Sequence, residues 1–152
     1  MTKTYKVDAI KNGTVIDHIP EEKGILIAEL LCLKSWQYPV TIGVSFTSQN
    51  QGKKDIIKIE NRELTEEEVN KIALIAPQAT INIIRNYQVA KKFQVELPDI
   101  LDNIIKCSNP DCVTNHEPIS CSRFFLEENR RNQLFRCAYC ERYYTREDLE
   151  IV

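Results

Sequence analysis

The sequence predicts an α+β protein in two parts, an antiparallel sheet with two helices on one face followed by a small, mainly β, cysteine-rich segment. Short runs rich in Val, Ile, Thr and Tyr alternate with two helical patterns in the first part. Five of the six cysteines follow residue 100. Leu97-Pro98 interrupts the chain between the two parts, because proline restricts the preceding residue to extended conformations. We therefore expect two domains, residues 1–96 and 97–152.

The first predicted elements are a pair of strands and a helix. Residues 4–10 and 14–19 are rich in β-branched residues and flank Asn12-Gly13. This dipeptide readily adopts the positive φ angles of a tight turn, so the two runs are expected to form a hairpin. After Pro20, apolar residues at spacings of three and four predict a mostly buried helix over residues 21–34.

The second helix has the clearest start signal. Thr65 and Glu68 are spaced as a capping box, glutamates fill the first turn, and Pro77 ends the helix. Strands are expected at residues 40–46, 55–59, 79–84 and 87–95, with Arg85-Asn86 turning between the last two. Together these elements predict a ferredoxin-like sheet of five or six strands with both helices on one face.

Composition excludes several classes of protein. The chain has 152 residues, of which 43% are apolar and 28% charged, so it resembles an average soluble protein and not a disordered one. Its 20 basic and 22 acidic residues leave a net charge of −2, without the basic field that attracts nucleic acid. Its longest apolar stretches are broken at Glu29 and Lys34, far short of the roughly 20 residues of a membrane span. Residues 1–10 do not resemble a signal peptide, so a cytoplasmic location is expected.

The strongest chemical signal is the spacing of four cysteines in the second part. Four residues separate Cys107 from Cys112, and two separate Cys137 from Cys140. Two short-spaced pairs of thiolates predict a closed tetrahedral shell around one structural zinc ion, with no open position for hydrolytic chemistry. Because so short a segment buries little apolar surface, the metal is expected to decide whether this zinc domain folds.

The cysteines also admit other interpretations. Two disulfides or an iron–sulfur cluster would use the same four residues, but nothing in the sequence indicates an oxidising compartment. Cys121 lies between the pairs and is interpreted as a packed or free thiol. His116 is interpreted as a surface residue, because four cysteines already complete the shell. Cys32, on the first predicted helix, is expected in the core.

A second candidate site is a group of lysines near an Asp-His pair. The four glycines cannot assemble a dinucleotide fingerprint or a P-loop, so any phosphate must be held otherwise. On a strand, Lys54 and Lys58 point to one face, and Lys91 or Lys92 joins them if the last strand lies nearby. Asp17-His18 adds an acceptor for ribose hydroxyls and a donor for phosphate. From spacing alone, however, solvated surface lysines are the favoured interpretation.

Four groups of residues together resemble a known family. They are KVDAIKNGTVIDHIP at 6–20, KKDIIKIEN at 53–61, LIAPQATINIIRNYQV at 74–89, and the two cysteine pairs. In this order they resemble the regulatory chain of aspartate carbamoyltransferase. The resemblance implies a chain without catalysis of its own, which pairs with a second copy through its first domain and docks its zinc domain on the catalytic chain. It also implies that CTP, ATP or UTP on the first domain adjusts the first committed step of pyrimidine biosynthesis.

The resemblance also assigns roles to particular residues. Those of a nucleotide pocket are backbone groups of Ile10 and Tyr87 at the base, Asp17 and Lys58 at the ribose, His18, Lys54 and Lys92 at the phosphates, and Val7, Ala9, Val15, Asn82, Ile84 and Val89 around them. Asn109 and Glu141 match positions that contact the catalytic chain. The chain departs from the family at residues 46–52, at Lys91 and between residues 121 and 136. These departures leave the preferred nucleotide and the direction of its effect open.

Two rival functions use other features of the chain. Arginines and aromatic residues of the second part would suit a zinc-ribbon nucleic-acid binder, although acidic residues in the same segment oppose it. A stand-alone enzyme is disfavoured by the closed metal shell and by the lack of a recognisable nucleophile motif. Oligonucleotide binding with a steep salt dependence would support the first, and turnover by the purified chain alone would support the second.

Overall fold

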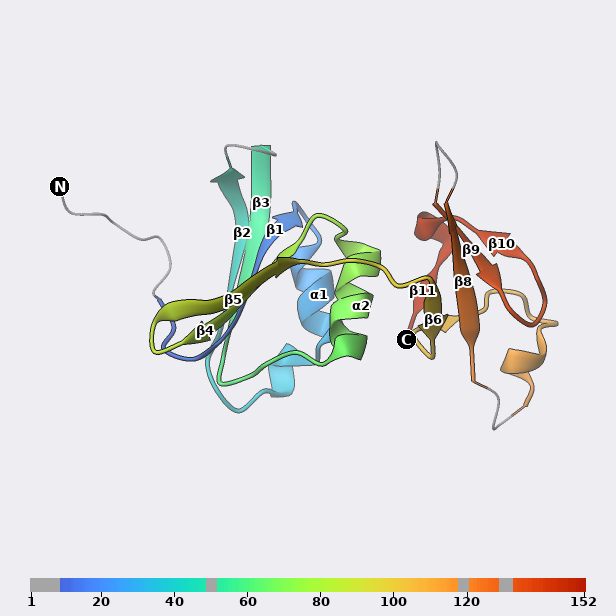
Figure 1. Cartoon of the computed structure of the whole chain (residues 1–152), viewed down its shortest axis with the longest axis horizontal. Helices are drawn as coiled ribbons and strands as arrows, with labels where there is room; N and C mark the ends of the chain where they lie inside the picture. Colours follow the sequence, from blue (N-terminus) through green and yellow to red (C-terminus); the bar gives the residue numbers. More distant parts are fainter. Residues whose placement is uncertain (1–8, 49–51, 118–120, 129–132) are drawn as a thin grey trace. The chain divides into compact units, whose positions relative to one another are not determined.

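The computed structural model describes residues 9–48, 52–117, 121–128 and 133–152 (Figure 1). The chain divides into two compact units, Met1–Glu96 and Leu97–Val152. The first unit carries two α-helices and an antiparallel sheet, and the second carries short strands around a cysteine cluster. The predicted α+β fold class is confirmed.

Five antiparallel strands form the sheet of the first unit in the order β2-β3-β1-β4-β5. In chain order they are β1 (Gly13–Pro20), β2 (Val40–Ser48), β3 (Gly52–Glu60), β4 (Thr80–Arg85) and β5 (Gln88–Gln94). One helix connects β1 to β2 and another connects β3 to β4, so each connection passes over the strand that lies between them. This is the predicted ferredoxin-like topology with β5 added at one edge.

The helices α1 (Gly24–Leu30) and α2 (Glu66–Ile75) lie on the same face of this sheet (Figure 1). Alternate residues of a strand point to opposite faces, so the core takes every second residue of the central strands. The buried apolar side chains of these elements include Ile16 and Ile19 of β1, Ile57 and Ile59 of β3, Ile81 of β4, Ile27 of α1, and Ile72 and Leu74 of α2. The intervening strand residues point to the opposite face of the sheet.

The predicted hairpin around Asn12-Gly13 is wrong. β1 pairs with β3 on one side and β4 on the other, so neither edge is available to residues 4–10. Of those residues the structure describes only 9 and 10, and neither lies in a strand. Gly13 is required for another reason, because its φ is 141° and an added Cβ would lie 2.0 Å from the carbonyl oxygen of Ile59.

The first helix is shorter than the predicted range 21–34. α1 ends at Leu30, and a 3-10 helix, η1 (Leu33–Ser35), follows it. Cys32 lies between them with a φ of 55°, a left-handed conformation that ends regular helix. Its side chain is exposed, so the expectation that Cys32 lies in the core is wrong.

A buried carboxylate fixes both the start of α1 and a bulge in β2. Asp55 of β3 is fully buried, and its Oδ2 accepts a hydrogen bond of 2.9 Å from the backbone N–H of Gly24. Its Oδ1 accepts one of 3.0 Å from the backbone N–H of Ser45, where the pairing of β2 with β3 changes register. Because both oxygens are hydrogen-bonded, the cost of burying this charge is offset.

The start of α2 follows its sequence signal, whereas the last turn of the sheet lies one residue beyond the predicted Arg85-Asn86. Thr65 Oγ1 accepts a hydrogen bond from the backbone N–H of Glu68, and the Glu68 carboxylate accepts one from the backbone N–H of Thr65, which confirms the capping box. The β4–β5 turn uses Asn86 and Tyr87, with φ angles of 52° and 65°. These paired positive angles are typical of a tight hairpin turn.

Short strands build the second unit. They are β6 (Ile100–Asp102), β7 (Ile105–Lys106), β8 (Arg123–Glu128), β9 (Gln133–Cys137), β10 (Tyr143–Tyr144) and β11 (Glu150–Ile151), with 3-10 helices η2 (Val113–Asn115) and η3 (Arg146–Asp148). One sheet has the order β10-β9-β8-β6, and β11 pairs with β7. Leu101, Ile104, Phe124 and Phe135 are buried between these elements. Within the described ranges of the whole chain, no helix is long and apolar enough to cross a membrane.

We expect Thr65→Ala to lower the free energy of unfolding of the first unit by about 1 kcal/mol, because it removes the oxygen that caps α2. Thr65→Ser keeps that oxygen and should stay within about 0.5 kcal/mol of the parent. Urea unfolding followed by the fluorescence of Trp36, the single tryptophan, reports on this unit. Equal stability of the two variants would contradict a stabilising cap.

Candidate functional site

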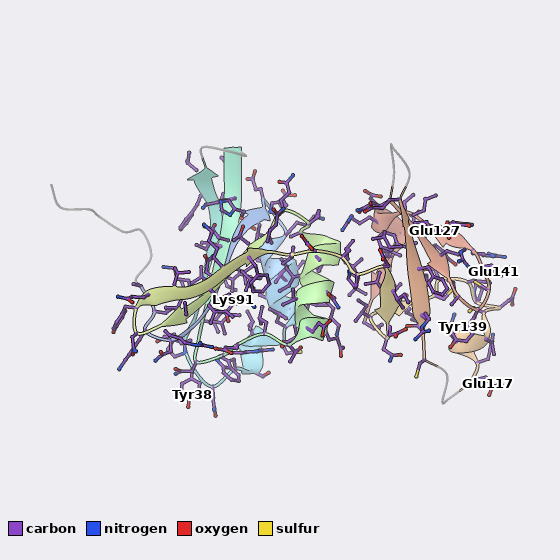
Figure 2. All side chains as sticks on the ribbon, in the orientation of Figure 1. Tyr38, Lys91, Glu117, Glu127, Tyr139 and Glu141 are labelled. Atoms are coloured by element: carbon purple, nitrogen blue, oxygen red, sulfur yellow. The ribbon has the colours of Figure 1, made fainter. Side chains whose placement is uncertain are left out.

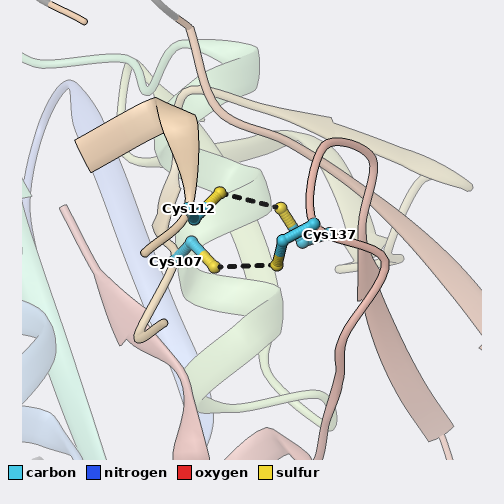
Figure 3. A group of neighbouring side chains, drawn as sticks. Cys107, Cys112 and Cys137 are labelled. Carbon is cyan, nitrogen blue, oxygen red and sulfur yellow. Dashed lines mark hydrogen bonds between the residues drawn. The ribbon is translucent and has the colours of Figure 1, made fainter. Parts of the chain in front are cut away.

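Four cysteines converge at one point of the second unit. Cys107 directly follows β7, Cys112 precedes η2, Cys137 ends β9, and Cys140 lies in the turn before β10. Their four Sγ atoms all lie within 4.8 Å of one another. Across the two turns, the Sγ atoms of Cys107 and Cys140 are 3.6 Å apart, and those of Cys112 and Cys137 are 3.8 Å apart (Figure 3).

These separations fit one tetrahedral metal ion. Metal–sulfur bonds of about 2.3 Å place the corners of a tetrahedron about 3.8 Å apart. A disulfide needs sulfur atoms about 2.05 Å apart, and all four cysteines are free. A tetrahedral site has four positions, so the four cysteines would fill it completely. Cys107, Cys112 and Cys137 are buried, and Cys140 is partly exposed.

The other two candidate ligands of this unit do not take part. Cys121 is exposed and does not belong to the group of four. The His116 ring is exposed, and its Nε2 lies 2.6 Å from the backbone carbonyl oxygen of Pro110, to which it donates. Both arrangements agree with the interpretation of Cys121 as a free thiol and of His116 as a surface residue.

The fold shifts the pKa values of three of these thiols, those of Cys107, Cys137 and Cys140. Burial raises the pKa of Cys137 to about 12 and raises that of Cys107 as well. Burial acts in the same direction on Cys140, but hydrogen bonds from the Arg142 backbone and the Asn109 side chain outweigh it and lower its pKa to about 7. A metal ion must displace protons from the weaker acids, so its affinity rises with pH.

Hydrogen bonds shape the two turns that carry the cysteines. Asn115 Nδ2 lies 2.8 Å from the carbonyl oxygens of both Cys107 and Asn109, and it donates to both. In the second turn, Glu141 has a φ of 63° and its backbone N–H donates to the Cys137 carbonyl at 2.9 Å. Asn109 is only 7% exposed, whereas Glu141 and the nearby Tyr139 have exposed side chains (Figure 2).

A row of side chains crosses the sheet of the first unit on the face opposite the helices, here called the polar sheet face. Strand register places Lys58 of β3 beside Val15 of β1, Val15 beside Asn82 of β4, and Asn82 beside Lys92 of β5. Adjacent strands lie about 4.8 Å apart, so the two lysine Cα atoms are separated by roughly 14 Å. The row thus has a cationic group toward each end.

A bulge in β1 brings further polar groups to one side of this row. The pairing of β1 with β3 shifts between Ile16 and Ile19, and His18 has a φ of 56°. Lys54 Nζ forms an ion pair of 2.8 Å with Asp17 Oδ1, and His18 Nδ1 lies 3.1 Å from Thr80 Oγ1. Burial alone would raise the pKa of Asp17, but hydrogen bonds from Lys54 and the His18 backbone hold it below its usual value.

The other side of the row is less polar. Gly13 of β1 lies opposite Ile84 of β4, and Ile84 lies opposite Val89 of β5. Tyr87 is 66% exposed, and its backbone N–H donates to the carbonyl oxygen of Lys11 at 2.9 Å. The neighbouring Ile10 is buried and Ala9 is exposed, while Val7 lies outside the described residues.

Strand alternation separates Lys92, which pairs with Asn82, from its neighbour Lys91, which pairs with Ile83. Lys91 Nζ lies 5.2 Å from the centroid of the Phe93 ring. Phe93 pairs with Ile81, a core residue, so Phe93 and Lys91 belong to the helix side of β5. Only Lys92 of this pair lies on the polar sheet face.

The sequence interpretation missed three polar side chains near these groups. Thr80 contacts His18, Tyr144 Oη lies 3.5 Å from Cys107 Sγ, and Thr114 Oγ1 lies 3.1 Å from Cys112 Sγ. Alternation with Asn82 could have placed Thr80 on the polar sheet face. No spacing signal could have found Tyr144, because it is 37 residues from Cys107 along the chain.

Comparisons with known proteins agree with these two arrangements. A family model described as the aspartate carbamoyltransferase regulatory chain, allosteric domain, matches residues 5–96, and one described as the metal binding domain of the same chain matches residues 99–150.

Relatives that bear the name aspartate carbamoyltransferase regulatory chain match nearly the whole sequence. The one from Thermococcus onnurineus is 52% identical over 148 residues, which are 97% of this chain and 95% of the relative. The one from Pyrococcus horikoshii is 48% identical over 149 residues, with the same shares of the two chains. The one from Bacteroides fragilis is 44% identical over 150 residues, 99% of this chain and 97% of the relative. The resemblance noted in the sequence is therefore confirmed, and the chain belongs to the family of aspartate carbamoyltransferase regulatory chains.

Proposed function

We propose that this chain is the non-catalytic regulatory subunit of aspartate carbamoyltransferase and that nucleotide effectors bind its polar sheet face. The observation that carries the proposal is the cross-strand row from Lys58 through Val15 and Asn82 to Lys92. Four strands contribute to this row, so the fold itself brings together residues that lie far apart in the sequence. A family match to the allosteric domain over residues 5–96 supports the same location.

The two sides of the row suit different parts of a nucleotide. His18, Lys54 and Lys92 supply cationic and hydrogen-bonding groups for phosphates, and Asp17 and Lys58 face the ribose. The less polar side, with Ile84, Val89 and backbone groups of Ile10 and Tyr87, suits a base, and Ala9, Val15 and Asn82 complete the lining. CTP and ATP are the proposed effectors, with UTP as a third.

Zinc is the proposed metal of the second unit. Four thiolates are soft ligands, and a closed tetrahedral sulfur shell is the usual form of a structural zinc site. The separations of 3.6 and 3.8 Å between Sγ atoms suit this ion. One ion per chain would then hold the second unit in the shape that docks on the catalytic chain. Glu141, which is exposed beside Cys140, is the better placed of the two proposed contact residues, because Asn109 is largely buried in its own turn.

The proposed mechanism is a shift between two conformations of the assembled enzyme. An effector that binds one conformation more tightly favours it, and the coupling is typically about 1 to 3 kcal/mol. The regulatory chain would transmit this preference through its metal-binding unit to the catalytic chain. In this way nucleotides would control the first committed step of pyrimidine biosynthesis.

The first unit is also proposed to pair with a second regulatory chain. β2 lies at one edge of the sheet, beside a mostly apolar groove of about 320 Å³. Its lining consists of the apolar residues Ile25, Ala28, Leu33, Val40 and Ile42 and the charged residues Glu29 and Lys34. Ile25 and Ile42 are 56% and 40% exposed. A second copy related by a twofold axis would cover the same groove on both chains and pair the two edge strands.

For the nucleotide site, we expect Lys58→Ala and Lys92→Ala each to weaken CTP and ATP binding about tenfold, because each removes a charged hydrogen bond worth about 1.5 kcal/mol. Lys91→Ala is the matched control, because Lys91 lies on the helix side of the same strand and should leave affinity unchanged. Titration calorimetry on the full chain measures all three. Parent-like affinity in both Lys58→Ala and Lys92→Ala would remove the proposed site.

For the metal centre, we expect Cys112→Ser to lose the bound zinc and the ability to co-elute with the catalytic chain, because it breaks the sulfur shell that holds the docking unit together. Cys121→Ser, a cysteine outside the shell, should keep both. Metal analysis and size-exclusion chromatography measure the two properties. Co-elution of a metal-free chain with its partner would contradict the docking role.

For pairing of the first unit, we expect Ile42→Glu to shift the isolated chain from dimer to monomer, because a dimer would bury the introduced charge in a mostly apolar groove. Gln88→Glu is the control, since Gln88 is exposed on β5, at the opposite edge of the sheet from β2. Sedimentation equilibrium gives the mass of each. The same dimer constant for parent and Ile42→Glu would place the interface elsewhere.

A further inference from the structure

Two side-chain hydroxyl groups lie against sulfur atoms of the metal centre. Tyr144 Oη is 3.5 Å from Cys107 Sγ, and Thr114 Oγ1 is 3.1 Å from Cys112 Sγ. A thiolate that binds metal carries no proton and can only accept a hydrogen bond. In the metal-bound protein the hydroxyl groups must therefore be the donors.

The charge of the centre makes such donors valuable. Four thiolates around a divalent ion leave two negative charges, and Cys107 and Cys112 are only 2% and 1% exposed. Little water can reach these sulfurs, so protein donors must stabilise their charge. Cys137 receives hydrogen bonds from backbone N–H groups of its own turn. The two hydroxyl groups contact the sulfur atoms of the other turn, Cys107 and Cys112, of which Cys107 also receives a hydrogen bond from the Asn109 backbone.

Both hydroxyl groups are held in place by the fold. The Tyr144 ring packs against the buried Phe124 ring, with centroids 6.1 Å apart, and Tyr144 pairs with Phe135 across β10 and β9. Thr114 lies in η2, two residues after the cysteine that it contacts. These contacts hold both hydroxyl groups against the sulfur atoms in the folded unit.

We propose that Tyr144 and Thr114 are positioning residues of the metal centre, whose hydroxyl groups donate hydrogen bonds to the Cys107 and Cys112 thiolates and so strengthen metal retention. This inference rests on the proposed occupation of the centre by a metal ion, and it holds whichever divalent ion binds.

The test uses the full chain loaded with Co²⁺, whose sulfur-to-metal charge-transfer absorption reports directly on the thiolates. Removing a donor raises the energy of the sulfur lone pairs, so Tyr144→Phe and Thr114→Val should each move this band to lower energy. Both should also lower metal affinity at least about 10-fold in competition with a chelator, as loss of a hydrogen bond to a ligand typically does.

Two controls separate hydrogen bonding from packing. Thr114→Ser keeps the hydroxyl group. Tyr143→Phe removes a hydroxyl group from the residue that precedes Tyr144; Tyr143 is 53% exposed and hydrogen-bonds Glu127 and not a cysteine of the cluster. Both should keep the parent band and affinity.

An unchanged band in Tyr144→Phe and Thr114→Val, even with weakened affinity, would overturn the inference, as would equal shifts in the controls. If Tyr144→Phe does not fold, Thr114→Val against Thr114→Ser decides. A parent chain that shows no charge-transfer band would overturn the proposed metal site itself.

Discussion

The second unit depends on four sulfur atoms held within 4.8 Å of one another. Its strands are short, and among its described residues only a few large side chains, such as Phe124 and Phe135, are fully buried. Metal binding at a structural site of this kind contributes about 10 to 16 kcal/mol in apparent terms, which counts directly as folding energy. In the proposed function, the surface offered to the catalytic chain is therefore only as well defined as the metal centre beneath it.

Most of the first unit could be predicted from local sequence signals, and the errors have one physical cause. The capping box at Thr65 and Glu68 depends on four neighbouring residues, so sequence alone identified it. The pairing partner of a strand depends on the whole sheet. Asn12-Gly13 looks like a hairpin turn, but β3 and β4 occupy both edges of β1. Cys32 followed the apolar pattern of a helix that in fact ends before it.

The residues of the two candidate sites were also predictable only where local sequence determines them, and not where they depend on strand pairing. Cysteine spacing alone identified the four cysteines that converge, because each turn brings its own pair together. Spacing could not choose between Lys91 and Lys92, because that choice needs the register of β5 on β4. The hydroxyl group of Tyr144 reaches Cys107 only through packing between distant strands, and nothing near it in the sequence indicates this contact.

The extra residue in β1 also limits how this protein can evolve. Regular pleating sends neighbouring residues to opposite faces, yet Asp17 and His18 both face Lys54 and Thr80, because the bulge takes up one position between Ile16 and Ile19. Deleting either of these two residues would restore the alternation and leave Ile19 in the core, but it would remove either the carboxylate that pairs with Lys54 or the imidazole that contacts Thr80. The core therefore tolerates a deletion at this point, whereas the polar group that would be lost is what selection must preserve.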